Sequence, residues 1–244
     1  MRKVALLTAL IAAVFGFVSV AVAAVTADQT LKVTIKGKAG TKAKPTAVSL
    51  GVLTGTHGTG TTPDGTFGTK LAVIHFDKNL KFNNAKFPTC SADQVAKDAS
   101  KCASGSKVGS GSADAKIEPA PGPLKANPTI VAYNGPSNQL FLKLIKGAAD
   151  QVDSSGVIPA KLSKDSGKYG SKLTVTIPKN FYNNLGLRIT LTRFLTNVKA
   201  TYKKTSYVTS VGCTSKKYNF AGDFTFIDGA GATNVEKVKT TAKC

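Results

Sequence analysis

The sequence predicts an all-β protein, a β-sandwich or jelly roll of about ten to twelve strands with one short helix. Short segments of alternating apolar and polar residues recur along the chain, and 23 glycines and 10 prolines supply turns between them. Helical periodicity occurs in one place, between Cys90 and Cys102. A chain of this length suits one large β domain, so residues 28–244 are predicted to form a single domain.

The first residues have the pattern of an export signal. Arg2 and Lys3 precede a long apolar stretch, and small residues at its end offer cleavage after Ala23 or after Ala27. The alternative is an uncleaved membrane anchor, because the apolar stretch is long enough to span a bilayer. We expect residues 1–23 to be a cleaved signal peptide and the protein to be secreted, with association to the cell envelope as a further expectation.

The first half of the chain alternates strands with two unusual connections. The segment TLKVTIK places Leu31, Val33 and Ile35 on one face and polar residues on the other, which is typical of a half-buried strand. Similar strands are predicted at 47–53, 70–77 and 80–82. Residues 54–69 are rich in Gly and Thr and are predicted to be a long loop. Residues 116–128 contain four prolines and are predicted to be a connector.

The second half is predicted to be denser in strands, with one irregular strand. The longest segment, 187–202, changes the parity of its apolar residues, so a β-bulge is expected near Arg193. The other predicted strands are 129–133, 139–146, 156–163, 171–178, 207–211 and 218–228.

Four cysteines in an exported chain predict two disulfides. The sequence allows three pairings, and loop closure favours Cys90–Cys102 with Cys213–Cys244, worth about 3 and about 4 kcal/mol respectively. Between the first pair, Ser91 and Gln94 have the spacing of a capping box, and Asp93 lies where the helix dipole favours an acid. A short helix over about 92–99, held by a disulfide, is therefore predicted.

Three chemical roles are conceivable for the segment between Cys90 and Gly111. A zinc site would need about four Cys or His ligands, a redox pair would need the CxxC spacing, and a phosphate loop would need a complete glycine motif before a helix. The sequence has none of these arrangements here. No metal, cofactor or catalytic site is predicted, and the small residues from Lys107 to Ile117 are interpreted as a strand against which a bulky group packs closely.

The charge of the chain indicates an anionic partner. Lysine and arginine number 33 against 13 acidic residues, a formal net charge of +20, and Arg188 and Arg193 are the only arginines after Arg2. Lysine is a mobile, hydrated point charge, so diffuse attraction to an anionic cell-wall polymer or a membrane surface is expected rather than a built anion pocket. A merely solubilising surface is the alternative. The candidate surface comprises Lys199, Tyr202, Lys203, Lys204, Tyr207, Lys216, Lys217 and Tyr218.

A hydrolase and a carbohydrate-binding module are the alternative functions. A secreted hydrolase would use His75 with a serine or aspartate brought close by folding, since catalytic triads are spatial arrangements. His57, the other histidine, lies in the Gly/Thr segment and is interpreted as an exposed side chain. A carbohydrate-binding module is the second alternative, although the sequence has no tryptophan. No specific nucleic-acid partner is expected, because the protein is predicted to be exported. The leading hypothesis is a non-catalytic structural or binding protein.

The segment KFPTCS, the cysteine that follows it and GSKVGSG together resemble a motif, FPxCS…C…GSxVGxG, of secreted, uncharacterised proteins of actinobacteria. The resemblance covers residues 71–244 and includes VGCTSKKYNFAGDFTF near the end. It implies a β-rich fold, an extracellular location and a terminal hairpin that closes on a cysteine. It implies no activity, because that family has none assigned, and the lysine excess is not part of it.

Overall fold

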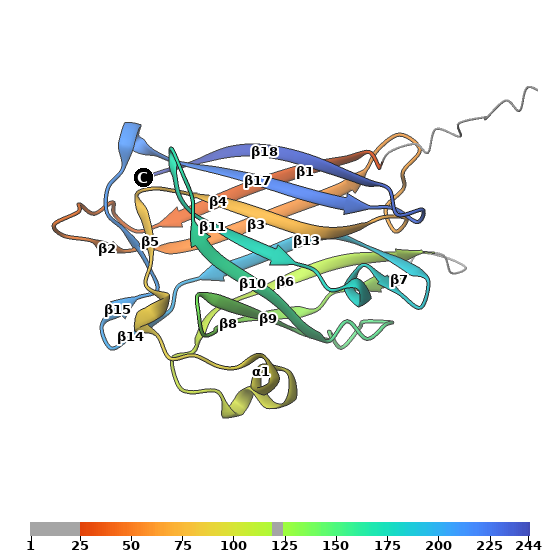
Figure 1. Cartoon of the computed structure of the whole chain (residues 1–244), viewed down its shortest axis with the longest axis horizontal. Coiled ribbons are helices and arrows are strands. Elements are labelled where there is room, and N and C mark those ends of the chain that lie inside the picture. Colours follow the sequence, from red (N-terminus) through yellow and green to blue (C-terminus); the bar gives the residue numbers. More distant parts are fainter. Residues whose placement is uncertain (1–24, 119–123) are drawn as a thin grey trace, which may run out of the picture.

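The computed structural model describes residues 25–118 and 124–244, and the predicted signal peptide lies outside this range. The all-β prediction is confirmed. One antiparallel sheet of 13 strands dominates the molecule, and its two edge strands lie against each other, so the sheet is nearly closed (Figure 1). Its strand order is β1-β3-β13-β6-β8-β9-β10-β11-β4-β17-β18, with β7 paired to β6 and β12 to β13.

The main sheet contains thirteen strands. They are β1 (Ala27–Lys36), β3 (Ser49–Gly58), β4 (Gly68–Asp77), β6 (Lys107–Glu118), β7 (Leu124–Ala126), β8 (Thr129–Asn134), β9 (Gln139–Ile145), β10 (Gly156–Lys164), β11 (Tyr169–Thr176), β12 (Asn183–Asn184), β13 (Leu187–Val198), β17 (Lys217–Ile227) and β18 (Thr233–Lys243).

Smaller elements surround this sheet. A three-stranded sheet contains β2 (Thr46–Ala47), β16 (Val208–Ser210) and β5 (Leu80–Phe82), and a hairpin contains β14 (Thr201–Tyr202) and β15 (Thr205–Ser206). The helical segments are α1 (Ala92–Asp98), η1 (Asn84–Lys86), η2 (Ala99–Lys101), η3 (Lys179–Phe181) and η4 (Thr214–Lys216). Within the described part of the chain, no helix has the length and apolar character needed to cross a bilayer.

The closing seam joins the two ends of the chain. The Asn234 side-chain amide donates a hydrogen bond of 2.9 Å to the Val25 carbonyl, so β1 and β18 start at the same end of the sheet and run in the same direction. Alternation along β1 buries Leu31 and Val33 and leaves Lys32 exposed, as predicted for a half-buried strand. The core therefore lies inside the sheet, enclosed by the inward face of every long strand.

Two predicted connections are wrong in their bounds. Residues 54–58 continue β3 and residues 68–69 begin β4, so the Gly/Thr loop is 59–67. Thr54 and Thr56 are β-branched, alternate with Gly55 and His57, and are buried, which suits a strand whose composition resembles a loop. The predicted connector at 116–128 likewise contains the end of β6 and all of β7, which pair with each other.

The helix and its disulfide form as predicted, with one difference. Cys90 is bonded to Cys102 across α1 and η2, and the Ser91 hydroxyl accepts a hydrogen bond of 3.2 Å from the Gln94 N–H. The Gln94 side chain does not complete the capping box but donates to the Lys101 carbonyl at 2.6 Å. Val95 is fully buried against Cys90 and Phe141, so α1 covers the outer face of β9.

Two further predictions are confirmed, the second disulfide and the β-bulge of β13. Cys213 is bonded to Cys244, which ties the residue after β18 to the segment before β17. The pairing of β13 with β6 shifts register between Leu191 and Arg193, which is the predicted β-bulge.

Candidate functional site

The two ends of the sheet differ in charge. Backbone pairing shows which strand termini lie at the same end of the sheet. Lys36 pairs with Ser49, Val198 with Gly109 and Lys243 with Lys217. The ends of β1, β13 and β18 therefore lie beside the beginnings of β3, β6 and β17. We name this the basic end; it lies on the left in Figure 1, beside the C-terminus. Its strand ends and loops carry exposed lysines, namely Lys36, Lys38, Lys42, Lys44, Lys78, Lys81, Lys164, Lys168, Lys199, Lys203, Lys204, Lys216, Lys217 and Lys243.

These lysines are not neutralised by neighbouring acids. Among the described residues, the ion pairs of lysine and arginine involve Lys101, Lys116 and Arg193, none of which belongs to the basic end. Asp77 lies at this end but is 2% exposed, and it accepts hydrogen bonds from the Asn79 and Asn219 backbone N–H groups. Asp165, in the turn between β10 and β11, is held by His75, so the lysines of the basic end have no ion-pair partner among the described residues.

Two turns of the basic end hold lysine in a left-handed backbone. Lys203 and Lys204, between β14 and β15, have φ angles of 46° and 66°, and Ser215 and Lys216 both have 57°. Hairpin turns of this kind favour Asn and Gly, because other side chains pay a steric penalty at positive φ. Sparsely populated backbone conformations of this kind cluster at functional sites. Lys203, Lys204 and Lys216 are therefore candidate binding residues.

The predicted surface residues are only partly brought together. Lys199, Lys203 and Lys204 lie around the β14–β15 hairpin, whereas Lys216 and Lys217 lie beside the C-terminal disulfide on the other side of the basic end (Figure 1). All five are exposed.

The predicted tyrosines of this surface are mostly interior. Tyr202 is half-buried, with the Lys203 Nζ 5.4 Å from its ring centroid. Tyr207 and Tyr218 are 1% and 0% exposed, so their assignment to a ligand surface is wrong. The Tyr207 hydroxyl donates to Asn134 Oδ1 at 3.2 Å, the Tyr218 hydroxyl is 2.7 Å from Ser210 Oγ, and burial raises the pKa of Tyr207. Alternation along β17 turns Tyr218 inward, whereas Tyr207 lies at the bend between β15 and β16, where Ser206 and Val208 are buried too.

His75, the residue of the hydrolase alternative, lies between two carboxylates on the outer face of β4. Its Nδ1 is 2.5 Å from Asp165 Oδ2, and its Nε2 is 3.6 Å from Asp223 Oδ2. Burial raises the pKa of Asp165, but hydrogen bonds from His75 and the Ser166 N–H outweigh this and leave the pKa below its ordinary value. A catalytic base would instead need one ring nitrogen directed at a nucleophile, and here each nitrogen faces a carboxylate.

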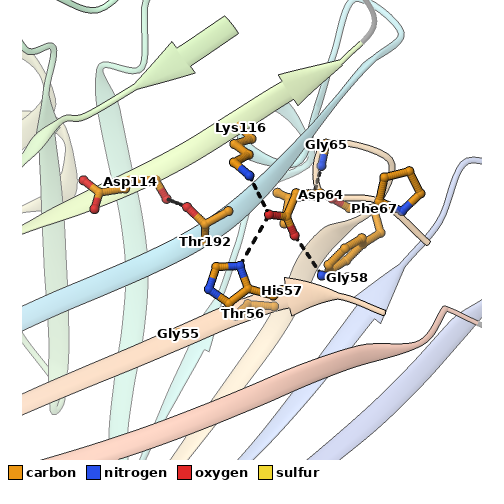
Figure 2. A network of polar contacts seen from close by, with 12 residues as sticks. Gly55, Thr56, His57, Gly58, Asp64, Gly65, Phe67, Asp114, Lys116 and Thr192 are labelled. Atoms are coloured by element: carbon orange, nitrogen blue, oxygen red, sulfur yellow. Dashed lines mark hydrogen bonds and ion pairs between the residues drawn. The ribbon is translucent and has the colours of Figure 1, made fainter. Parts of the chain in front are cut away.

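His57 belongs to a network that orders the loop after β3. Figure 2 shows the Asp64 carboxylate between His57 and Gly58 of β3 and Lys116 of β6. Lys116 Nζ is 2.9 Å from Asp64 Oδ2, the Gly58 N–H donates to Asp64 Oδ1 at 2.8 Å, and His57 Nδ1 is 3.4 Å from Oδ2. The His57 side chain is 65% exposed, in keeping with its interpretation as a surface side chain.

The interior of the sheet holds an apolar cavity of about 180 Å³. Inward-facing side chains of strands from β3 to β13 line it, and it reaches the surface beside Asn180 and Asn184, which are exposed. This mouth lies at the end opposite the basic end, where β11 finishes and β13 begins. The sequence patterns did not predict this cavity. Small side chains at inward positions, including Ala72, Ala113 and Ala115, are the sequence feature that could have indicated it, because they leave space inside the sheet.

Within the described ranges, no three histidines, cysteines or carboxylates are grouped so as to hold a metal ion. Comparison with protein-family models, curated proteins and solved structures finds no match for this chain. The resemblance to secreted actinobacterial proteins stays an expectation from the sequence.

Proposed function

We propose that this protein is a secreted, non-catalytic binding protein of the cell envelope or extracellular space that attaches to anionic polymers through its basic end. The observation that carries the proposal is the concentration of exposed, unpaired lysines at one end of the sheet. The two disulfides indicate a compartment outside the cytoplasm, where anionic wall polymers and lipid headgroups are found.

A polymer fits this surface better than a small anion. The lysines are spread over several loops and strand ends, and lysine offers a point charge without the fixed fork that arginine uses for bidentate anion recognition. A flexible chain of phosphates or carboxylates can contact many such charges at once and release counterions from each contact. The left-handed Lys203–Lys204 turn supports the same reading, because a lysine pair is held there against backbone preference.

The test measures retention of the purified mature protein on envelope preparations and its affinity for inorganic polyphosphate across a salt series. Affinity should fall steeply with salt. Replacing Lys203, Lys204, Lys216 and Lys217 together by Gln should weaken polyphosphate binding by about tenfold at low salt.

The matched control replaces Lys70, Lys125, Lys146 and Lys179 together by Gln, four exposed lysines at the opposite end of the sheet. It should change the affinity much less than the basic-end variant. Binding that does not respond to salt, or equal losses in both variants, would remove the support for the basic end as the binding surface.

Secretion is part of the proposal and predicts where the mature chain begins. Val25 and Ala27 are 1% and 7% exposed, and the Val25 carbonyl accepts a hydrogen bond from the Asn234 side chain. Both residues therefore belong to the folded core. Cleavage after Ala23 retains them, whereas cleavage after Ala27 would remove them. We expect amino-terminal sequencing of protein from the culture medium to begin at Ala24; a start at Asp28 would be inconsistent with this.

A further inference from the structure

The interior cavity is unfilled by the protein's own side chains. Leu173 and Val175 of β11 and Leu191 and Phe194 of β13 line the cavity, yet all four are only partly buried. In a close-packed core such inward residues would be covered by neighbours on every side. Their remaining exposure is therefore to the space inside the sheet.

The cavity has the size of a small apolar molecule. An apolar cavity of about 150 Å³ binds one benzene molecule, so about 180 Å³ holds about six to eight carbon atoms. The lining runs from Val52 to Thr56 on β3 and from Ala72 to Phe76 on β4, which is about 13 Å along each strand. A space of this volume that follows the strands suits a short linear acyl or alkyl chain.

The chemistry of the lining selects the head group. Among the described residues that line the cavity, Asp153 alone is ionisable, and it is exposed near the mouth. An anionic head group would be repelled there, and the lining offers it no cation. Asn180, Asn184 and Ser155 line the mouth with amide and hydroxyl groups that can hydrogen-bond to an uncharged head.

We propose that the interior of the sheet binds one uncharged, single-chain amphiphile of about six to eight carbons, such as a medium-chain alcohol or ester, with its polar head at the Asn180–Asn184 mouth. The proposal rests on the interior alone and is independent of the anionic-polymer function. Binding would be driven by burial of the chain and would not depend on the basic end.

The experiment measures the binding of primary alcohols from butanol to dodecanol by isothermal titration calorimetry. Saturable binding at one site per chain is expected. Each added methylene should tighten binding about fourfold until the chain reaches about six to eight carbons, after which the gain should stop. Affinity should not change between low and high salt.

A cavity-filling variant gives the structural test. Ala115 of β6 faces the cavity and is only partly buried, whereas Ser110 of the same strand is exposed. Ala115→Phe should abolish alcohol binding while leaving the thermal unfolding midpoint unchanged or raised, because the new ring occupies vacant space. Ser110→Phe, the matched control, should bind as the wild type does.

The opposite results are equally informative. Absent binding in the wild type, an affinity that does not grow with chain length, or full binding by Ala115→Phe would overturn the proposal. Ala72→Leu on β4 is a second, milder filling variant. If both fillings lower the unfolding midpoint as overpacking a dense core does, the space does not exist and the proposal fails.

Discussion

Asp64 shows how a single carboxylate can order a loop that its composition would leave flexible. Burial raises the pKa of Asp64, but hydrogen bonds from the Gly58 N–H, Lys116 and His57 outweigh it, so the pKa lies below its ordinary value of 3.8. A carboxyl group with a lowered folded pKa stabilises the fold fully above its unfolded pKa and loses that contribution as the pH falls through the folded value.

We expect Asp64→Asn to lower the free energy of unfolding at pH 7 by about 1 kcal/mol, because charge-assisted hydrogen bonds are lost. Its stability should also decline less than that of the wild type as the pH is lowered below 3.8, where the wild-type carboxylate becomes protonated. Denaturant unfolding between pH 2 and pH 7 measures both effects. Asp28→Asn, at an exposed position of β1, is the control and should follow the wild-type profile.

The Lys203–Lys204 turn predicts opposite effects on stability and binding. Replacing the pair by Asn-Gly suits the left-handed backbone, so the free energy of unfolding should rise by about 1 kcal/mol. Polyphosphate affinity should fall, because two lysines of the basic end are removed. The two quantities are measured on the same double variant by denaturant unfolding and by titration. A turn that becomes both more stable and a better binder would contradict the functional role assigned to it.

At the residue scale, the sequence predicted local chemistry better than exposure. Ser91 caps α1 as its spacing indicated. Lysines close in sequence suggest a surface position for Tyr207 and Tyr218, but both rings are in the core. In β17 the exposed Lys217 places Tyr218 on the opposite, inward face, and Tyr207 is buried at a bend between two short strands, which no periodicity indicates.

The helix and its disulfide are the element that the sequence specified most completely, since capping and loop closure are local effects. The glycines of β6 were also interpreted correctly as a site of close approach, but the group that approaches is different. A Cβ atom at Gly111 would collide with the Leu195 backbone carbonyl of β13 rather than with a bulky side chain. Contact with a neighbouring strand could not be inferred before the strand order was known.

Gly111→Ala should therefore destabilise the protein by about 2 kcal/mol, the usual cost of forcing an atom into packed structure. The matched change Ser110→Ala, at the exposed neighbouring position, should alter stability by less than about 0.5 kcal/mol. Thermal or denaturant unfolding compares them directly. Equal stability of Gly111→Ala and the wild type would show that β13 can move away from β6 at no cost.

At the scale of the whole molecule, the strands were predictable and their closure was not. Periodicity indicates that a segment is a strand, but the pairing of β4 with both β11 and β17 brings together segments far apart in the chain. The interior cavity depends on that closure, because it is enclosed by strands from both halves of the sequence. Composition likewise predicted the positive charge without showing that much of it gathers at one end.

Replacing Cys213 and Cys244 by Ser tests how far the terminal disulfide holds the sheet together. We expect the free energy of unfolding to fall by about 3–4 kcal/mol, since the bond closes a long loop in the unfolded chain. The double change Cys90→Ser with Cys102→Ser removes a bond that closes a shorter loop, so the loss of unfolding free energy should be somewhat smaller. A larger loss from the second pair would indicate that α1, and not the C-terminal strand, is the more important clamp.

The seam between β1 and β18 has a consequence for self-association. These are the two edges of the sheet, and the register among the described residues does not join them by a backbone ladder. Their outward positions carry the exposed lysines Lys32, Lys36, Lys237 and Lys239. Charged side chains on an edge repel an incoming strand, so these four lysines disfavour strand pairing between copies of the chain along this seam.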